Sequence, residues 1–577
     1  MKQHYFLLIL VFTVFHLYAQ HPDFKTDFEK SMGTETATYE HIIAFYKKLA
    51  DTYPEIEIHA IGNTDSGEPL HIVILNPDRE FDFDTIRGKK RILLINNGIH
   101  PGESDGIDAT MLLYRDIVLG KIKMPEHTVL VTIPVYNIGG ALNRNHTTRT
   151  NQNGPLEYGF RGNARNYDLN RDFIKCDTKN ARSFAVIFHR VQPDVFIDNH
   201  VSNGADYQYA LTHLFTQHDK LGGELGTYLN EGLQPQLERE LAAKNWPITP
   251  YVNVFNQVPE TDFSQFMDYP RYSTGYTTLF NTLGMMVETH MLKPYKQRVE
   301  GTYELMKSMI RLIDKDARKI KELRDQSFRR YETGIHYPLD WEIDSSQITT
   351  LHFKGYEGAF IDSKITGAKR LKYREDKPFT KDIVYYDHFK PSVEVTIPKA
   401  YVIPQGWSPI IELLNINKVE MNRFEKDTAL NVESYRIKNY ETRKMPYEGH
   451  YPHYNTKVIA ENKRVDFSKG DYIISTTQPA IRYLLETLEP QAPDSFFNWN
   501  FFDTVLQQKE HFSPYVWEDM AEKMLEENPA LQAEFEQKKQ TEPDFAKNWY
   551  TQLDWLYKHS VHYEKAHMQY PVYRIIE

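Results

Sequence analysis

The stretch INNGIHPGES places a histidine and a glutamate, His100 and Glu103, three residues apart. The apolar run at residues 92–95 predicts a buried strand, and Pro101-Gly102 predicts a tight turn directly after it. A strand that ends in such a turn can direct both side chains toward one point above a sheet. Imidazole and carboxylate together suit zinc. The pair alone is weak evidence, because a histidine and a glutamate can share a turn by chance.

A second histidine, His200, is the candidate third ligand. It ends the stretch VFIDNH, whose apolar residues predict another buried strand. Reactive zinc sites have three protein ligands and one open position. If the two strands lie in one sheet, His200 can reach the point toward which His100 and Glu103 are directed. On its own, His200 would be interpreted as a core or surface histidine.

Two further motifs contain groups that bind charged partners. In NARNYDLNRDF, Asn170 and Arg171 pair a side-chain amide with a rigid guanidinium fork, a combination that binds carboxylates. The competing interpretation is an Asn- and Asp-rich loop with an exposed arginine. In GMMVETH, Glu288 lies among apolar residues, and a carboxylate in such a strand needs a partner or a function. A buried salt bridge would satisfy the same requirement.

Strands and helices alternate along the first half of the chain. We expect helices at residues 36–50, 106–120 and 179–191, and strands at residues 70–75, 90–100, 127–137, 193–201 and 283–291. The strands lack polar alternation, which indicates an α/β fold with helices on both faces of the sheet. Ligands of such folds bind at the carboxyl ends of the strands. His100, His200 and Glu288 all fall at or near such ends.

The later part of the chain has a different sequence pattern. A helical stretch at residues 300–325 closes the first domain, which we place at residues 20–327. Short β-like runs with Pro and Gly breaks then predict a β-rich domain at residues 328–477. Residues 478–577 are expected to be mostly helical. In the β-rich part, YEGHYPHY contains Glu448, His450 and His453; this could imitate a metal site, but we interpret it as a loop.

The N-terminus predicts export. Residues 1–19 contain one basic residue, an apolar run and a small residue at Ala19, the pattern of a signal peptide. A membrane anchor is the alternative, but the apolar run is too short for one. No later segment offers about 18 uninterrupted apolar residues, so no membrane association is expected after cleavage. A periplasmic or extracellular location follows.

Composition narrows the possible partners. The formal net charge of −11 argues against nucleic acid. The single cysteine, Cys176, excludes an intramolecular disulfide and has no base beside it in sequence, so we interpret it as a packing residue.

The ordered set of motifs is more specific than any one of them. His-x-x-Glu, Asp-Leu-Asn-Arg, a strand ending in His and a strand-borne Glu resemble the carboxypeptidase A-like zinc metallocarboxypeptidases. The resemblance covers roughly residues 35 to 310, and the C-terminal half resembles the extension of exported bacterial members. It implies an α/β fold, a mixed sheet flanked by helices (an α/β/α sandwich), followed by the β-rich domain and the helical C-terminal segment. It also implies one Zn²⁺, held by His100, Glu103 and His200.

The resemblance also implies roles for the remaining residues. Glu288 would be the general base that activates water, and Asp168 would orient a ligand histidine. Asn170 and Arg171 would bind the C-terminal carboxylate of the substrate. For the arginine that polarises the scissile carbonyl we favour Arg149, with Arg144 and Arg161 as alternatives. For the family's mobile tyrosine, the stretch MDYPRYSTGY offers Tyr269, Tyr272 and Tyr276; we choose Tyr272, and Arg271 beside it could also contact a carboxylate.

The function implied is an exported zinc carboxypeptidase that acts on peptides with a free C-terminal carboxylate. The same site could instead belong to a zinc amidohydrolase that cleaves N-acyl amino acids or cell-wall peptides. A third hypothesis is a non-catalytic surface binding protein on a peptidase scaffold. It is disfavoured because the metal-ligand set and Glu288 are all present. The side-chain preference and the oligomeric state stay open.

Overall fold

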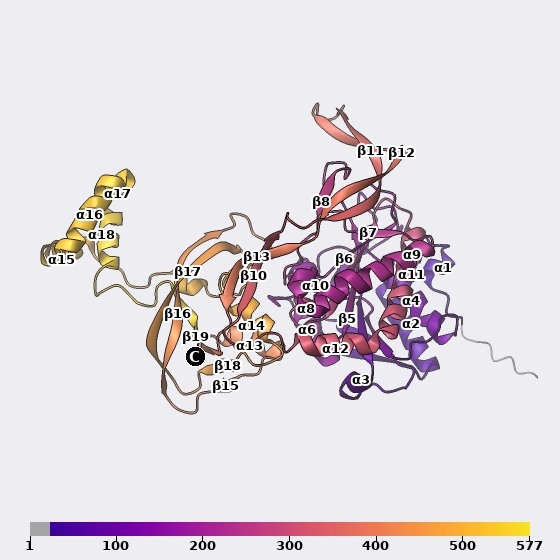
Figure 1. Cartoon of the computed structure of the whole chain (residues 1–577), viewed down its shortest axis with the longest axis horizontal. Helices are drawn as coiled ribbons and strands as arrows, with labels where there is room; N and C mark the ends of the chain where they lie inside the picture. The colour runs from indigo at the N-terminus through magenta and orange to yellow at the C-terminus, as the bar shows by residue number, and fades with distance from the viewer. Residues whose placement is uncertain (1–22, 577) are drawn as a thin grey trace, which may run out of the picture.

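The structure is a computed structural model that describes residues 23–576, and a mixed eight-stranded sheet forms the centre of its first half (Figure 1). Within this sheet, β3 is parallel to both β4 and β5, and β5 is parallel to β9. The pairs β2–β4 and β6–β9 are antiparallel. In sheet order the strands are β1 (Ile56–Asn63), β2 (Pro69–Leu75), β4 (Thr128–Ile133), β3 (Arg91–Asn96), β5 (Val195–Ser202), β9 (Leu283–His290), β6 (Leu211–Phe215) and β7 (Ile248–Pro250).

Helices cover both faces of this sheet. Successive residues of a strand point to opposite faces, and neighbouring residues of β5 show what lies on each. Asn199 contacts Met306 of α11 (Tyr295–Lys315), which packs against α4 (Asp105–Val118). Asp198 accepts a hydrogen bond from Ser273 Oγ of α10 (Ser273–Thr278), which packs near α6 (Lys179–Val191). The sheet is therefore the middle layer of an α/β/α sandwich.

The remaining helices of the first half are shorter or lie at its periphery. They are α1 (Asp27–Lys30), α2 (Tyr39–Thr52), α3 (Phe83–Lys89), α5 (Ile138–Leu142), η1 (Leu169–Arg171), α7 (His218–Leu221), α8 (Gly223–Thr227), η2 (Tyr228–Leu233), α9 (Gln234–Ala243) and α12 (Ala317–Ser327). The predicted mixed sheet flanked by helices is confirmed. The stretch expected as one helix at residues 300–325 is two helices, because the first ends at Lys315 and the second begins at Ala317.

Three smaller sheets follow the first half. The long hairpin of β11 (Thr349–Asp362) and β12 (Lys369–Tyr386) projects from the molecule, and β12 pairs in parallel with β8 (Asp262–Ser264) of the first half (Figure 1). Strands β10 (His336–Ile343) and β13 (Phe389–Thr396) form a pair. The third sheet has six strands: β15 (Asn422–Arg423), β18 (Tyr472–Ser475), β14 (Ala400–Ile403), β19 (Gln569–Ile575), β16 (Thr428–Thr442) and β17 (His453–Phe467).

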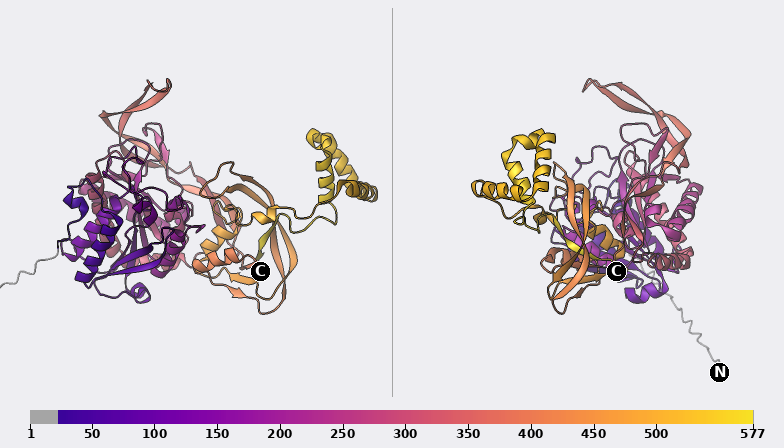
Figure 2. Two further views of the ribbon diagram at one scale, coloured as in Figure 1. Left: turned by 180° about the vertical axis from the view of Figure 1, so that it is seen from behind. Right: turned by 60° about the vertical axis from the view of Figure 1, so that its left-hand side comes forward.

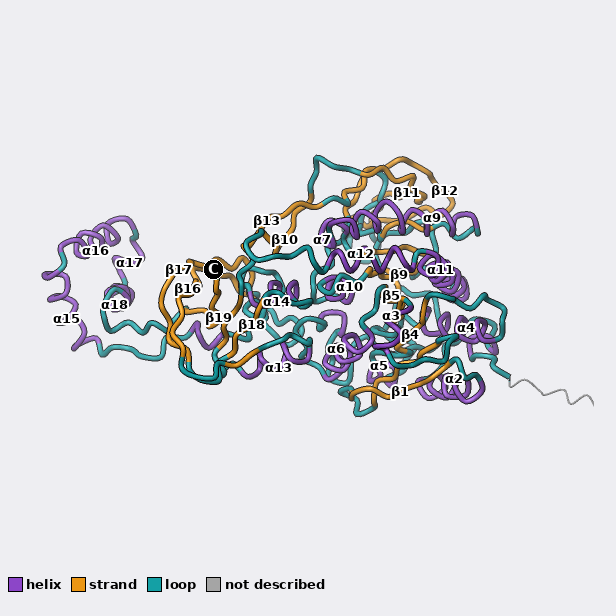
Figure 3. Tube along the Cα trace, turned by 60° about the horizontal axis from the view of Figure 1, so that its bottom comes forward, coloured by secondary structure: helices purple, strands orange, loops and turns teal. Residues whose placement is uncertain are grey.

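The end of the chain combines helices with one unexpected strand. Helices α13 (Ser408–Ile416), α14 (Ile481–Leu488) and η3 (Asp503–Leu506) lie with the six-stranded sheet, and β19 enters that sheet between β14 and β16. Four more helices pack on an apolar cluster of their own and lie apart in Figure 1, Figure 2 and Figure 3. These are α15 (Pro514–Glu527), α16 (Pro529–Thr541), α17 (Pro543–Lys547) and α18 (Trp549–Lys558). The domain limits at residues 327 and 477 stay a proposal.

Sequence analysis predicted an N-terminal signal peptide and no membrane-spanning segment after it. The predicted signal peptide at residues 1–19 lies outside the described residues. Among the helices that the structure describes, none has the length and the apolar character needed to cross a membrane.

Candidate metal centre

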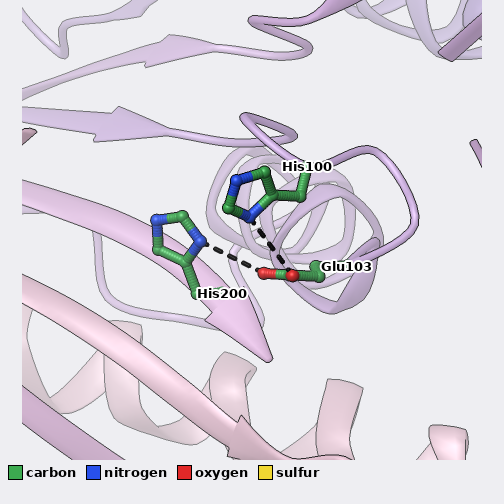
Figure 4. A group of neighbouring side chains, drawn as sticks. All are labelled: His100, Glu103 and His200. Carbon is green, nitrogen blue, oxygen red and sulfur yellow. Dashed lines mark hydrogen bonds and ion pairs between the residues drawn. The ribbon is translucent and has the colours of Figure 1, made fainter. Parts of the chain in front are cut away.

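The carboxylate of Glu103 lies between two imidazole rings (Figure 4). Its Oε1 is 3.2 Å from His100 Nδ1, and its Oε2 is 3.1 Å from His200 Nδ1. Each of the three residues is only 3% exposed, and their ligand atoms all lie within 4.8 Å of one another. The structure therefore brings the three predicted ligands together, with the same ring nitrogen of each histidine facing Glu103.

The turn between His100 and Glu103 has little room for other residues. It is closed by a hydrogen bond from Glu103 N to His100 O (2.8 Å), immediately before α4 begins at Asp105. A Cβ at Gly102 would lie 2.5 Å from the Arg149 side chain and 2.9 Å from Gly159 O. Glycine is therefore required if the loop that carries Arg149 is to pack against the turn.

A carboxylate holds the outer nitrogen of each histidine. His100 Nε2 is 2.8 Å from Asp168 Oδ1, and His200 Nε2 is 2.9 Å from Asp198 Oδ2. Such a partner favours the tautomer with the proton on Nε2 and leaves Nδ1 free to bind a metal. His100 Nδ1 fits this state, because it is buried and makes no hydrogen bond within the described chain.

Of these two partners, Asp168 was predicted and Asp198 was missed. Burial opposes the ionisation of Asp168, but His100 and Arg161 hold the pKa of its carboxyl well below the usual range. Asp198 stands two residues before His200 in β5, so both side chains point to the same face of the sheet. That spacing in VFIDNH is a signal that sequence analysis could have used.

Glu288 lies on the strand next to His200. The register of β5 and β9 places the two residues directly opposite each other. Burial raises the pKa of the Glu288 carboxyl to about 8, with smaller contributions from Glu103 and Asp198. A divalent cation at the three ligands would favour the ionised form, which is the form that can accept a proton.

Two of the three candidate arginines reach the ligand carboxylate. Arg149 Nη2 donates to Glu103 Oε1 at 2.8 Å, and Arg161 Nη1 lies 3.6 Å from the same oxygen. Arg161 is also bound to Asp168 Oδ2 through two nitrogens, at 2.8 and 3.0 Å. Arg144 instead donates to the main-chain oxygens of residues 36 and 37. Both Arg149 and Arg161 line a cavity of about 550 Å³ beside the ligands.

Asn170 and Arg171 lie on the short helix η1, which begins after Asp168. The Asp168 side chain caps this helix by accepting a hydrogen bond from Asn170 N (2.9 Å). Asn170 Oδ1 accepts from Ser273 N at 3.2 Å, and the Arg171 guanidinium lies 4.6 Å from the centre of the Tyr272 ring. One short helix therefore connects a partner of the ligand His100 to the predicted carboxylate clamp.

The other candidates near Tyr272 have different surroundings. Tyr276 is fully buried, and Tyr269 donates to Asp340 Oδ1 at 2.9 Å. Arg271 forms an ion pair with the buried Asp494 at 2.9 Å. Of the three tyrosines, only Tyr272 contacts the clamp.

Tyr251 is a site residue that sequence analysis missed. It follows β7 directly, in the stretch PITPYVNV, which contains no recognisable motif. Burial and the nearby carboxylates of Glu288 and Glu103 raise the pKa of the Tyr251 hydroxyl, and Arg171 opposes this shift. The phenol therefore lies within electrostatic range of Glu288, Glu103 and Arg171.

The C-terminal half contributes a loop to the same cavity. Glu448 Oε2 accepts a hydrogen bond from Asp168 N at 2.8 Å and lines the cavity beside Arg161. His450 Nε2 is 2.7 Å from Asp177, whereas His453 Nε2 is 2.9 Å from Asp503. The three residues of YEGHYPHY thus have separate partners, and the loop is a wall of the cavity.

Comparison with known proteins supports a peptidase relationship. No family model matches the chain. Over 490 residues it is 21% identical to carboxypeptidase 2 of Trichophyton rubrum and 22% identical to that of Trichophyton tonsurans, covering 81% of this chain and 84% of each relative. Among solved structures, carboxypeptidase A of Helicoverpa armigera is 13% identical at a TM-score of 0.37, covering 49% of this chain and 74% of that one.

The chain is therefore similar in sequence to carboxypeptidases, and it contains a buried His-x-x-Glu pair and a distant His whose ligand atoms converge. Its mixed eight-stranded sheet flanked by helices agrees with the fold class that the ordered motifs predicted. The two relatives named above are fungal, and a bacterial type stays a prediction.

Proposed function

We propose that this chain is an exported zinc carboxypeptidase that removes the last residue of peptides with a free C-terminal carboxylate. The observation that carries the proposal is the buried convergence of His100, Glu103 and His200, with Glu288 opposite His200 on the next strand. One zinc ion held there would lower the pKa of a coordinated water toward about 7 and polarise the scissile carbonyl.

The side chains around the ligands supply the proton transfer and the positive charge. Glu288 accepts a proton from the attacking water and passes it to the leaving amine. Arg149 is directed at Glu103 and is partly exposed to the cavity, so it can stabilise the negative charge that develops on the carbonyl oxygen. Arg161, on the same cavity, shares this role and also holds Asp168.

The clamp determines which bond lies at the metal. Asn170 and Arg171 bind the C-terminal carboxylate, and the ring of Tyr272 supports the Arg171 guanidinium. Because the charge of Arg271 is paired with Asp494, we assign Arg271 an indirect role, through its contact with the ring of Tyr447. Glu448 lines the cavity, and Tyr447 lies beside the Arg171 side chain.

The proposal is tested by the products of the zinc-loaded protein. We expect the zinc-loaded protein to release single C-terminal amino acids from peptides. A chelator should abolish this release, and added zinc should restore it. Faster cleavage of N-acyl amino acids than of peptides would instead favour the amidohydrolase hypothesis. No hydrolysis of either class by the zinc-loaded protein would favour the binding protein.

Replacing Arg171 by Met should selectively reduce activity on substrates with a free carboxylate. Loss of a charge-assisted hydrogen bond costs about 1.5–3 kcal/mol, which corresponds to roughly 10–150-fold in kcat/KM. The measurement compares peptides with a free C-terminus and the same peptides with a C-terminal amide. Arg165→Met, an exposed residue of the same loop, is the matched control and should leave the preference unchanged. An unaltered preference in Arg171→Met would exclude Arg171 as the clamp.

Replacing Tyr251 by Phe should lower kcat/KM by about fivefold to tenfold, the effect expected for one neutral hydrogen bond of about 1 kcal/mol. We expect the hydroxyl to contact the substrate because it lies within electrostatic range of Glu288, Glu103 and Arg171. Steady-state kinetics on one peptide measures the effect. Tyr303→Phe removes a hydroxyl that binds Asp116 away from the cavity and serves as the control. Equal rates for the parent and Tyr251→Phe would show that the phenol does not contact the substrate.

A further inference from the structure

We propose that His218, Asp219 and His388 form a second metal site, which binds a divalent ion such as zinc and fixes the projecting β-structure to the first half of the chain. His218 and Asp219 begin α7, directly after β6. His388 lies in the turn between β12 and β13. His388 is 170 positions from His218 in sequence, but the ligand atoms of the three residues lie within 4.8 Å of one another.

The distances between these atoms fit a shared ion. His218 Nε2 is 3.3 Å from His388 Nδ1. Asp219 Oδ2 is 3.5 Å from His218 Nε2 and 3.7 Å from His388 Nδ1. Tetrahedral zinc with bonds of about 2.0–2.2 Å requires ligand atoms about 3.3–3.6 Å apart. Two imidazoles and a carboxylate are also ligand types that zinc prefers.

Two hydrogen bonds, each between a main-chain atom and a side chain, already hold the two segments in this position. Phe389 N donates to Asp219 Oδ2 at 2.8 Å, and Gln217 Nε2 donates to Asp387 O at 2.9 Å. The carboxylate and the His388 turn are therefore oriented before any ion binds. Because the side chains of His218, Asp219 and His388 are 12%, 29% and 24% exposed, an ion can enter from solvent.

A buried acceptor next to the cluster has no partner. Asp387 is 6% exposed, and its Oδ1 makes no hydrogen bond within the described chain. Asp387 and His218 both line a cavity of about 10 Å³, which is about the room of one water molecule. A water in the fourth position of the ion could donate to this oxygen. With two histidines, Asp219 and this water, the ion would have four ligands. None of them belongs to the first centre.

The site would have a structural consequence. The hairpin β11–β12 and the strand β13 lead into the later part of the chain, and β8 of the first half pairs with β12. The pairing of β8 with β12 is one connection between the first half and the hairpin. An ion between α7 and the β12–β13 turn would add a second connection. It would restrain the long hairpin relative to the sheet that carries the first centre.

Zinc counts on the full-length chain and its variants test the proposal. After dialysis against zinc and removal of excess metal, we expect two zinc ions per parent chain and one fewer in His388→Ala, with peptide hydrolysis retained. His352→Ala removes an exposed histidine of the same hairpin that pairs with Asp382, and should leave the count unchanged. An equal zinc count in the parent and His388→Ala would overturn the site and show that His218 and His388 share only a hydrogen bond.

A second measurement does not depend on the folding of His388→Ala. In His100→Ala, whose first centre is disrupted, added zinc should still raise the thermal midpoint, and a chelator should reverse the rise. No zinc-dependent shift in that variant would overturn the second site. The proposed peptidase function is tested separately, because its failure would abolish hydrolysis without changing the loss of zinc in His388→Ala.

Discussion

Replacing Glu288 by Gln should reduce kcat for peptide hydrolysis by about 10²–10⁴-fold, the range typical of general acid–base catalysis. The substitution keeps the shape of the side chain and removes the group that accepts the proton. Because Glu288 faces His200 from the neighbouring strand and is not one of the three converging ligands, the zinc content should stay the same. Steady-state kinetics and zinc analysis of the same preparation measure both quantities.

The control for this variant is Glu300→Gln, which removes an exposed carboxylate from α11 and should have parental activity. The pH profile provides a further check. Burial raises the pKa of Glu288 to about 8 in the metal-free chain, and a bound cation shifts it downward. Activity of the parent should therefore fall as the pH decreases through a value below 8, because the base becomes protonated. Parental rates in Glu288→Gln would contradict the mechanism.

Replacing His100 by Ala should remove one zinc ion per chain together with essentially all hydrolysis. The side chain is buried, its Nδ1 makes no hydrogen bond, and its loss leaves two ligands, fewer than the three of reactive zinc sites. Asp168→Asn should have a smaller effect, about 10–100-fold in zinc affinity, because Asp168 is not one of the three converging residues and reaches the centre through the outer nitrogen of His100. Zinc titration followed by an activity assay measures both variants.

His41→Ala is the matched control for His100→Ala, because His41 is a largely exposed histidine of α2 that pairs with Asp27. It should retain the parental zinc count and rate. If His100→Ala bound as many zinc ions as the parent, the assignment of the first centre would be wrong. The far-UV circular dichroism spectrum of the variant verifies its fold independently of either metal site.

Sequence patterns predicted the parts of the site that lie at strand ends. His100, His200 and Glu288 follow or occupy continuous apolar strands, and such strands can be recognised from a few neighbouring residues. The parallel pairing of β3, β5 and β9 then brings these ends together. The turn at Gly102 also has a local signal. The convergence of these residues could therefore be predicted without a structure.

The residues that sequence analysis missed depend on contacts between distant segments. Tyr251 and Glu448 approach the cavity from loops that carry no periodic pattern, and β19 enters a sheet whose other strands lie about a hundred or more residues earlier. For a related reason, sequence analysis could not decide between Arg149 and Arg161 as the arginine that polarises the scissile carbonyl. Both belong to an irregular segment between α5 and η1, and the structure places both beside Glu103.

The central claim is most directly tested by mass spectrometry of a peptide digested by the zinc-loaded protein. We expect a ladder of products that lose one residue at a time from the C-terminus, with no ladder after chelation and none from the same peptide with a C-terminal amide. Internal cleavage, or a ladder that starts at the N-terminus, would contradict the assignment of Arg171 and Asn170 as a carboxylate clamp beside the metal centre.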